Sequence, residues 1–301
     1  MPNPEHATPL TDVPLFAAIT AWCEADVIAS TVANAFAQGC ERVFLVDNES
    51  PDDTVAVARA AGAEVGSIYH TDFDDQGKRL AEVRRVLQRV SEETGAPHVW
   101  WLTTDADEFP HGPGGRTLRQ YLDRLDQRFR MVGARAFNHY PSRGTAHVAG
   151  RHPLDFQPLC QEVRQAWCSL YHWKHPLVRW DRSGPPLWPG NGFHRMAPAG
   201  RRLDEPIHAT FLHHFQYRER ADTQRRLERL CRADHGKARA SLEEAMGPPS
   251  SAVRRLRTME DVYEGRWDRV TSPLKVGATG VTLSPWTELV GQPDNLVQRW
   301  Y

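Results

Sequence analysis

The stretch Val99-Trp-Trp-Leu-Thr-Thr-Asp-Ala-Asp-Glu-Phe109 decides the fold class of this chain. It opens with the apolar run Val99–Leu102 and closes on three carboxylates, Asp105, Asp107 and Glu108. A buried carboxylate is costly unless it is solvated, paired or bound to a cation, and ligands of open α/β sheets bind at the carboxyl ends of the strands. The stretch therefore predicts a buried strand that ends at a ligand site, and Asp-x-Asp suits Mg²⁺ or Mn²⁺. A polar turn that only caps the next helix is the alternative.

Bulk composition excludes several classes of protein. The chain has 301 residues, 40% of them hydrophobic and 25% charged, and a net charge of −1, so no global field favours nucleic acid or an anionic membrane. Its five cysteines show no Cys-x-x-Cys spacing, which argues against a disulfide framework and a zinc ribbon. The first twelve residues lack the pattern of a signal peptide, and no apolar run approaches the ~18 residues of a membrane span. We expect a soluble, cytoplasmic protein with no transmembrane segment and no nucleic-acid partner.

The first third of the chain alternates between strand and helix patterns. The expected strands are Leu15–Ala21, Arg42–Asp47, Ala63–Tyr69 and Val99–Leu102. One expected helix begins near Asp26, a second begins near Pro51, and a third spans Leu80–Val90. The elements expected later are a helix over Thr117–Phe129, a strand over Met131–Phe137 and a basic helix over Glu219–Ala233. This alternation predicts βαβ units and a mostly parallel central sheet flanked by helices, an α/β fold. The tail from Pro248 has only weak periodicity.

The βαβ rhythm is lost from Asn138 to Gly200, a segment rich in His, Pro, Trp and Gly. It is too aromatic for a disordered linker, so we expect ordered, ligand-facing loops. The alternative is that its tryptophans only fill a core beneath the sheet.

Carboxylates stand at or just after the ends of three expected strands. Glu24 follows the first strand, Asp47 ends the second, and Asp105 and Asp107 follow the fourth. Because parallel strands end at one edge of the sheet, these side chains are expected to converge there. Helix capping is the alternative, but it does not account for Glu24 or Asp47.

Three motifs around these carboxylates resemble those of family 2-type glycosyltransferases, which have the Rossmann-like GT-A fold. They are Glu24-Ala-Asp-Val-Ile28, Val46-Asp-Asn-x-Ser-x-Asp-x-Thr54 and Asp105-Ala-Asp-Glu-Phe109. The third motif, with the later Gly192-Phe-His194 and His214-Phe-x-x-Arg218, is similar to the Asp-x-Asp branch that resembles family 92. The resemblance covers residues 13 to about 230. It implies a nucleotide-sugar-binding half, 13–137, an acceptor and metal-completing half of the same domain, 138–235, and a C-terminal extension, 236–301. The loops expected from Asn138 to Gly200 would form the acceptor side of the cleft. Many family members have Asn-Glu where this chain has Cys23-Glu24, and the usual downstream Glu-Asp pair is not evident.

The resemblance implies a role for each matched residue. Glu24 and Asp47 contact the ribose and base of a nucleoside diphosphate-sugar, Asp105 faces the ribose and the metal, and Asp107 binds the metal directly. His214 completes the metal shell, because the resemblance places a histidine at this position. Only one of His213 and His214 can face the metal, since adjacent strand residues point to opposite faces.

Cationic residues for the diphosphate are Lys78 or its neighbour Arg79, together with Lys174 and His194. Solvated helix residues are the alternative for the first two.

An inverting transfer needs a carboxylate beside the acceptor hydroxyl. Glu162 is the candidate base, with Asp181 and Asp155 as competitors. For each of them, a structural ion pair with a nearby arginine is the alternative.

The sequence thus predicts a metal-dependent glycosyltransferase that uses Mn²⁺ or Mg²⁺. It would transfer a sugar, with inversion, from a nucleoside diphosphate-sugar to a hydroxyl of a small molecule or glycan. The alternatives are a nucleotidyltransferase of nucleotide-sugar synthesis and a non-catalytic nucleotide-sugar binding module.

Overall fold

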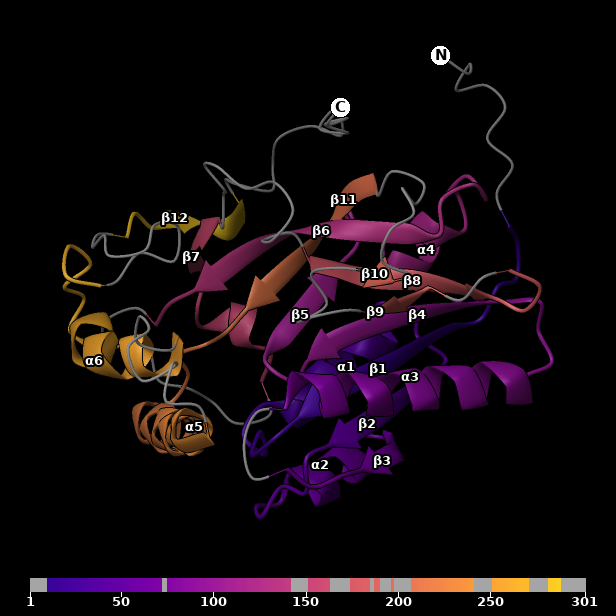
Figure 1. Cartoon of the computed structure of the whole chain (residues 1–301). Coiled ribbons are helices and arrows are strands. Elements are labelled where there is room, and N and C mark those ends of the chain that lie inside the picture. Colours follow the sequence, from indigo (N-terminus) through magenta and orange to yellow (C-terminus); the bar gives the residue numbers. More distant parts are fainter. Residues whose placement is uncertain are drawn as a thin grey trace.

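The structure is a computed structural model that describes residues 10–71, 75–141, 151–162, 174–184, 187–189, 196–197, 207–240, 251–270 and 281–287. Helices cover a central, strongly twisted sheet in a mixed α/β arrangement (Figure 1). The strands are β1 (Leu15–Ala21), β2 (Arg42–Asp47), β3 (Glu64–Ile68), β4 (His98–Asp105), β5 (Glu108–His111), β6 (Met131–His139), β7 (Leu159–Glu162), β8 (Lys174–Asp181), β9 (Trp188–Pro189), β10 (Met196–Ala197), β11 (Ile207–His214) and β12 (Ser284–Pro285). The helices are α1 (Ile28–Ala37), α2 (Thr54–Ala60), α3 (Gln76–Glu93), α4 (Leu118–Leu122), α5 (Arg220–Ala240) and α6 (Ser251–Tyr263).

The main sheet has the strand order β12-β7-β6-β8-β4-β1-β2-β3. Strands β3, β2, β1 and β4 are parallel, whereas β8 runs antiparallel to both β4 and β6. Strand β11 pairs parallel with β6 and antiparallel with the short β5. The predicted α/β fold with a central sheet flanked by helices is therefore confirmed.

Alternating side chains of β1 build two cores, one on each face of the sheet. Leu15, Ala17 and Ile19 belong to the core shared with α1, whereas Phe16 and Ala18 belong to the core shared with α3. The period of two in a strand requires this division, and burial on both faces explains why the strand is apolar throughout.

Several expected elements are confirmed, and others have different bounds. The first two strands have the predicted ends, but β4 continues past Leu102 because Thr103 and Thr104 remain buried strand residues. Helix α4 is shorter than the predicted Thr117–Phe129. Helix α1 has no side-chain N-cap hydrogen bond, and the carboxylate of Asp26 binds an arginine instead.

The largest difference lies between residues 138 and 200, where loops were expected. Lys174–Asp181 forms the buried strand β8 in the middle of the sheet, between β4 and β6. Trp180 packs in the same core as Trp101, so this tryptophan fills the core as the alternative stated. Trp188 is partly buried against that core, and Trp167 and Trp173 lie outside the described residues.

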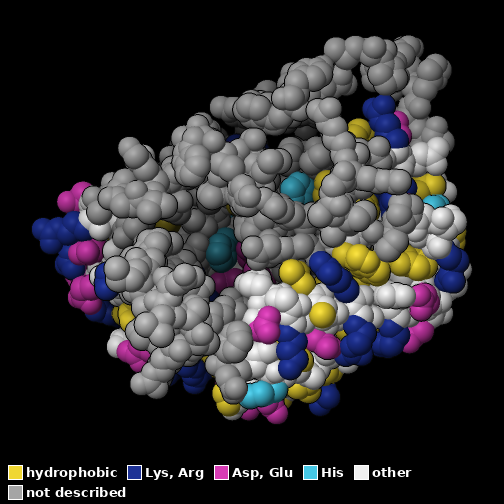
Figure 2. Space-filling view, viewed as in Figure 1, with side chains coloured by type: hydrophobic (Ala, Val, Ile, Leu, Met, Phe, Trp, Pro, Cys, Tyr) yellow, Lys and Arg dark blue, Asp and Glu magenta, His cyan; other side chains and the backbone are white. Residues whose placement is uncertain are grey.

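The C-terminal helices α5 and α6 pack against each other and against the β6–β11 side of the sheet through a third core that includes Tyr140, Tyr217, Leu227 and Val262. No described helix has the length and apolarity required to cross a membrane. Acidic and basic side chains intermingle on the face seen in the space-filling view, in keeping with the net charge of −1 (Figure 2).

Buried histidines lie between β5, β6 and β11. His139 Nε2 is 2.8 Å from His213 Nδ1, and the ring of His111 lies 5.2 Å from that of His213. Burial lowers the pKa of His111 and His139 to about 4 and lowers that of His213 well below its usual value. The folded protein therefore holds these three imidazoles neutral.

We expect His111, His139 and His213 to stay uncharged between pH 7 and pH 5 in the folded protein. Because their pKa values are lower than in the unfolded chain, their contribution to stability is complete above about pH 6.5 and is lost as the pH falls towards about 4. Imidazole ¹⁵N NMR across this range measures the charge directly. Protonation of any of the three above pH 5.5 would contradict the prediction.

Candidate active site

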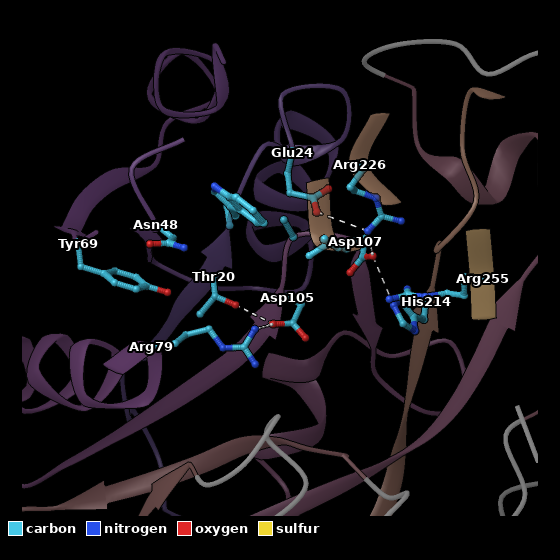
Figure 3. Close-up of a pocket in the computed structure, with 14 residues that line it drawn as sticks. Thr20, Glu24, Asn48, Tyr69, Arg79, Asp105, Asp107, His214, Arg226 and Arg255 are labelled. Carbon is cyan, nitrogen blue, oxygen red and sulfur yellow. Dashed lines mark hydrogen bonds and ion pairs between the residues drawn. The ribbon is translucent and has the colours of Figure 1, made fainter. Parts of the chain in front are cut away.

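A pocket opens at the carboxyl ends of β1, β2 and β4, and the C-terminal helices supply its far wall (Figure 3). Its lining includes Thr20, Glu24, Asn48, Tyr69, Arg79, Asp105, Asp107, His214, Arg226 and Arg255. The carboxylates at the ends of β1 and β4 thus converge, as expected from the parallel order of these strands.

Asp105, the last residue of β4, is held by two cations and a hydroxyl. Lys174 Nζ lies 2.9 Å from its Oδ2, Arg79 Nη1 lies 3.4 Å from Oδ1, and Thr20 donates a hydrogen bond of 2.7 Å. Burial alone would raise the pKa of Asp105, but Lys174 and Arg79 outweigh it and lower this pKa. Lys174 also contacts Glu108 at 2.5 Å. Asp105 is therefore ionised at neutral pH.

Asp107 lies two residues further on and faces the C-terminal half of the chain. Its Oδ2 is 3.1 Å from Arg226 Nη1, 3.4 Å from His214 Nε2 and 3.9 Å from Arg218 Nη1. Burial opposes ionisation, but these neighbours keep the pKa of Asp107 well below its usual value. Its carboxylate is consequently charged and turned towards the pocket.

Arg218 ties the turn after β1 to the C-terminal half. Its Nη2 donates to Glu24 Oε2 at 2.6 Å, and its Nε donates to Asp26 Oδ2 at 2.6 Å. Burial raises the pKa of Glu24 to about 7, against the opposing effect of Arg218 and Arg226. The Arg218 side chain is only 2% exposed, so it positions the pocket wall from behind.

The two adjacent histidines of β11 face opposite sides. His214 lines the pocket, whereas His213 is buried against His139 and Trp286. Gln216 Nε2 lies 3.2 Å from His214 Nδ1 and supports the ring from behind. The alternation expected for a strand is present, and it gives His214 the pocket position.

The loop after β2 places Asn48 in the pocket lining, which does not include Asp47. Asp47 is fully buried, and its two carboxylate oxygens accept hydrogen bonds from the backbone N–H and the hydroxyl of Ser50. Asn48 Oδ1 accepts from the Thr71 N–H at 2.9 Å, which leaves the amide Nδ2 as a donor. Asp47 is not among the residues that line the pocket, and its assignment to the nucleotide base stays a prediction.

Of the cationic residues expected at the diphosphate, some lie at the pocket and others do not. Lys78 is exposed, and its Nζ donates to the His70 carbonyl at 2.7 Å, so Arg79 is the one of this pair that lines the pocket. Lys174 reaches Asp105 from β8, as described above. His194 lies outside the described residues.

The three candidate bases do not line the pocket. Asp181 pairs with Arg179 and Arg130 and lies opposite His98 in the β4–β8 register, at the other end of β4 from Asp105. Seven residues of strand separate those ends, roughly 23 Å.

Glu162 and Asp155 also form ion pairs with arginines. Glu162 forms an ion pair with Arg135 at 2.7 Å. In the sheet, Glu162 of β7 lies directly opposite Phe137 of β6, and Phe137 lies directly opposite His213 of β11. Directly opposed residues share a face, so Glu162 points to the face away from His214. Asp155 is half-exposed and pairs with Arg151.

Sequence reasoning missed Arg226 and Arg255. Arg226 lies on α5 one turn before Leu230, and both line the pocket, so the i, i+4 spacing was the available signal. Arg255 lies on α6, in a tail whose weak periodicity gave no indication of a pocket wall.

The described residues offer only part of the ligand shell that a divalent cation requires. Among the described residues, no three His, Cys, Asp or Glu side chains form a ready metal site. Asp107 Oδ2 and His214 Nε2 lie 3.4 Å apart, and this carboxylate and imidazole are ligands suited to Mn²⁺ or Mg²⁺. Mg²⁺ is commonly held by one or two carboxylates plus substrate phosphates, so the residues fit a cation that arrives with a diphosphate.

Comparison with known proteins finds no matching family model and no matching curated protein. Among solved structures, the chain is similar to glucosyl-3-phosphoglycerate synthase from Mycobacterium tuberculosis in complex with Mn²⁺, uridine diphosphate and glucosyl-3-phosphoglycerate, with 15% identity over 42% of this chain and 44% of that chain and a TM-score of 0.27. It is also similar to mannosyl-3-phosphoglycerate synthase from Rubrobacter xylanophilus, with 21% identity over 41% and 40% of the two chains and a TM-score of 0.28. S. aureus TarS matches with 12% identity over 46% of this chain and 23% of its own, at a TM-score of 0.30. The matched part spans less than half of each of these structures.

Proposed function

We propose that this chain is a GT-A glycosyltransferase that transfers a sugar from a nucleoside diphosphate-sugar to a hydroxyl acceptor. The observation that carries the proposal is the convergence of Asp105, Asp107 and His214 on one pocket at the carboxyl edge of a parallel sheet. Ligands of open α/β sheets bind at this edge, and acidic oxygens with an imidazole suit a cation carrying a diphosphate.

The charge balance of the pocket supports a cation requirement. Three carboxylates and three guanidiniums are among the lining residues, so they balance one another. A diphosphate donor adds about two negative charges, and a bound cation would supply the counter-charge. We propose that Asp107 and His214 hold Mn²⁺ or Mg²⁺ with Asp105 nearby, and that the cation neutralises the charge of the departing diphosphate.

The remaining lining residues bind and orient the donor. Asn48 and Tyr69 lie at the ends of β2 and β3, and they are assigned to the nucleoside. Arg79 and Lys174 hold Asp105 in place and bring positive charge beside the diphosphate.

An inverting transfer also needs a base for the acceptor proton. Glu162 and Asp181 are engaged by arginines outside the pocket lining, and the proposal assigns the base to neither.

Ligand-induced stabilisation tests the proposed function. Purified protein is heated with a panel of nucleoside diphosphate-sugars, each with and without Mn²⁺, and its Tm is measured. We expect at least one donor to raise Tm, and to raise it more with Mn²⁺, because a ligand that binds only the folded state stabilises it. A panel without any shift, at millimolar donor and Mn²⁺, would refute the proposal.

Replacing Asn48 by alanine is expected to raise the donor KM about tenfold and to change kcat little. A contact to the nucleoside is the same in the ground state and the transition state, and its loss costs about one hydrogen bond. Thr71→Val is the matched control, because it removes the hydroxyl that bonds Asn48 Oδ1 but leaves the pocket amide present. A collapsed kcat with an unchanged KM would instead move Asn48 into the reacting part of the site.

A further inference from the structure

Two arginines of the C-terminal helices stand at the end of the pocket farthest from the nucleoside residues. Asn48 and Tyr69 mark one end in Figure 3, Asp105 lies between, and Asp107, His214, Arg226 and Arg255 lie at the other end. A donor whose nucleoside lies at the first end and whose diphosphate lies near Asp105 and Asp107 points its sugar towards this second end. The acceptor must therefore approach where α5 and α6 meet the sheet.

The two arginines differ in what they contact. Arg226 is buried, and its Nη1 is 3.1 Å from Asp107 Oδ2 and 3.6 Å from Glu24 Oε1, so it serves the carboxylates of the pocket. Arg255 is only partly buried, and its Nη1 donates to the side-chain oxygen of Gln216 at 3.3 Å. That bond is one of the contacts that hold the Arg255 guanidinium at the pocket wall.

The surroundings of Arg255 favour an incoming anion. Its pKa is lowered first by burial and then by the like charge of Arg226, and these two effects outweigh the opposing effects of Tyr217, Asp107 and Glu24. Both effects disfavour the guanidinium cation, and an anionic group placed beside it would offset them. A planar guanidinium also matches carboxylate and phosphate oxygens in a bidentate geometry.

We propose that Arg255 binds an anionic group, a carboxylate or a phosphate, carried by the acceptor. The inference rests on the proposed function and adds the acceptor's chemical class to it. It also gives α6 a part in the site, since a helix in the C-terminal extension supplies the specificity contact. Arg226 adds positive charge beside Arg255 while it keeps its ion pair with Asp107.

The test uses three acceptor probes that share a three-carbon polyol backbone: glycerol, glycerate and glycerol 3-phosphate. Each is titrated by calorimetry into the full chain saturated with Mn²⁺ and with the nucleoside diphosphate of the donor that gives the largest thermal shift. We expect binding of glycerate, glycerol 3-phosphate or both, and none of glycerol. The two anions distinguish a carboxylate site from a phosphate site.

Arg255→Gln should weaken the bound anion about 10- to 100-fold, which is the range of one charged hydrogen-bonded contact. Arg255→Lys should recover part of this loss, because it keeps the charge but not the bidentate fork. Arg257→Gln is the matched control, since Arg257 is exposed on the same helix, and it should bind as the wild type does.

Three results would overturn the inference. One is equal binding of glycerol and the anions, another is wild-type anion affinity in Arg255→Gln, and the third is a loss in Arg255→Gln of affinity for the nucleoside diphosphate itself, which would assign Arg255 to the donor. Failure of the proposed function looks different, because the wild type would then bind no nucleoside diphosphate at the first step.

Discussion

Asp107→Asn is expected to lower the transfer rate by about a hundred- to a thousandfold at saturating donor, with the fold intact. Removing one preorganised charge from the site of developing charge has effects of this size. Asparagine keeps the shape and can still accept hydrogen bonds from Arg226 and His214, which contact the Asp107 carboxylate at 3.1 and 3.4 Å. It loses the negative charge that a cation needs. Initial rates of nucleoside diphosphate release measure the effect.

The matched control for this substitution is Asp123→Asn. Asp123 lies at the end of α4, is about half-exposed and makes a long 3.9 Å ion pair with Arg119. It should keep the wild-type rate, and circular dichroism should be unchanged in both variants. Wild-type turnover in Asp107→Asn would remove Asp107 from the proposed cation site.

Arg218→Met is expected to lower the free energy of unfolding by about 3–5 kcal/mol, the range for removing one partner of a buried ion pair. Methionine fills a similar volume, but it leaves Glu24 and Asp26 without the guanidinium that contacts both at 2.6 Å. Urea unfolding at pH 8 measures the loss. Arg220→Met, two residues later, is the control: its exposed pairs with Glu260 and Glu264 should cost at most about 1 kcal/mol.

The pH dependence separates lost charge pairing from lost packing in Arg218→Met. Burial raises the pKa of Glu24 to about 7 and Arg218 lowers it, so removing Arg218 raises this pKa further. A group with a raised pKa in the folded state stabilises the fold more as the pH falls, so the deficit of the variant should shrink from pH 8 to pH 6. A deficit that is constant with pH, or no larger than that of Arg220→Met, would contradict the role given to Arg218.

Much of the structure of residues 13–137 could be predicted because local patterns determine it. The strands Leu15–Ala21 and Arg42–Asp47 have the predicted ends, since buried parallel strands are continuous apolar runs bounded by polar turns. The convergence of Glu24, Asp105 and Asp107 followed from the parallel order alone, because parallel strands end at one edge. The opposite faces of His213 and His214 followed from the period of two in a strand.

The sequence by itself thus determined the α/β class, the edge at which acidic side chains gather and the opposite faces of His213 and His214. Only the tertiary structure decided that β8 enters the middle of the sheet, that Asn48 rather than Asp47 lines the pocket, that Glu162 and Asp181 serve ion pairs, and that α5 and α6 bring Arg226 and Arg255 to the far wall. The physical reason is the range of the contacts. Periodicity and strand ends are set by neighbours along the chain, whereas each of the latter features depends on which partner a side chain meets. Arg218, for example, meets Glu24 and Asp26 more than 190 residues away in sequence.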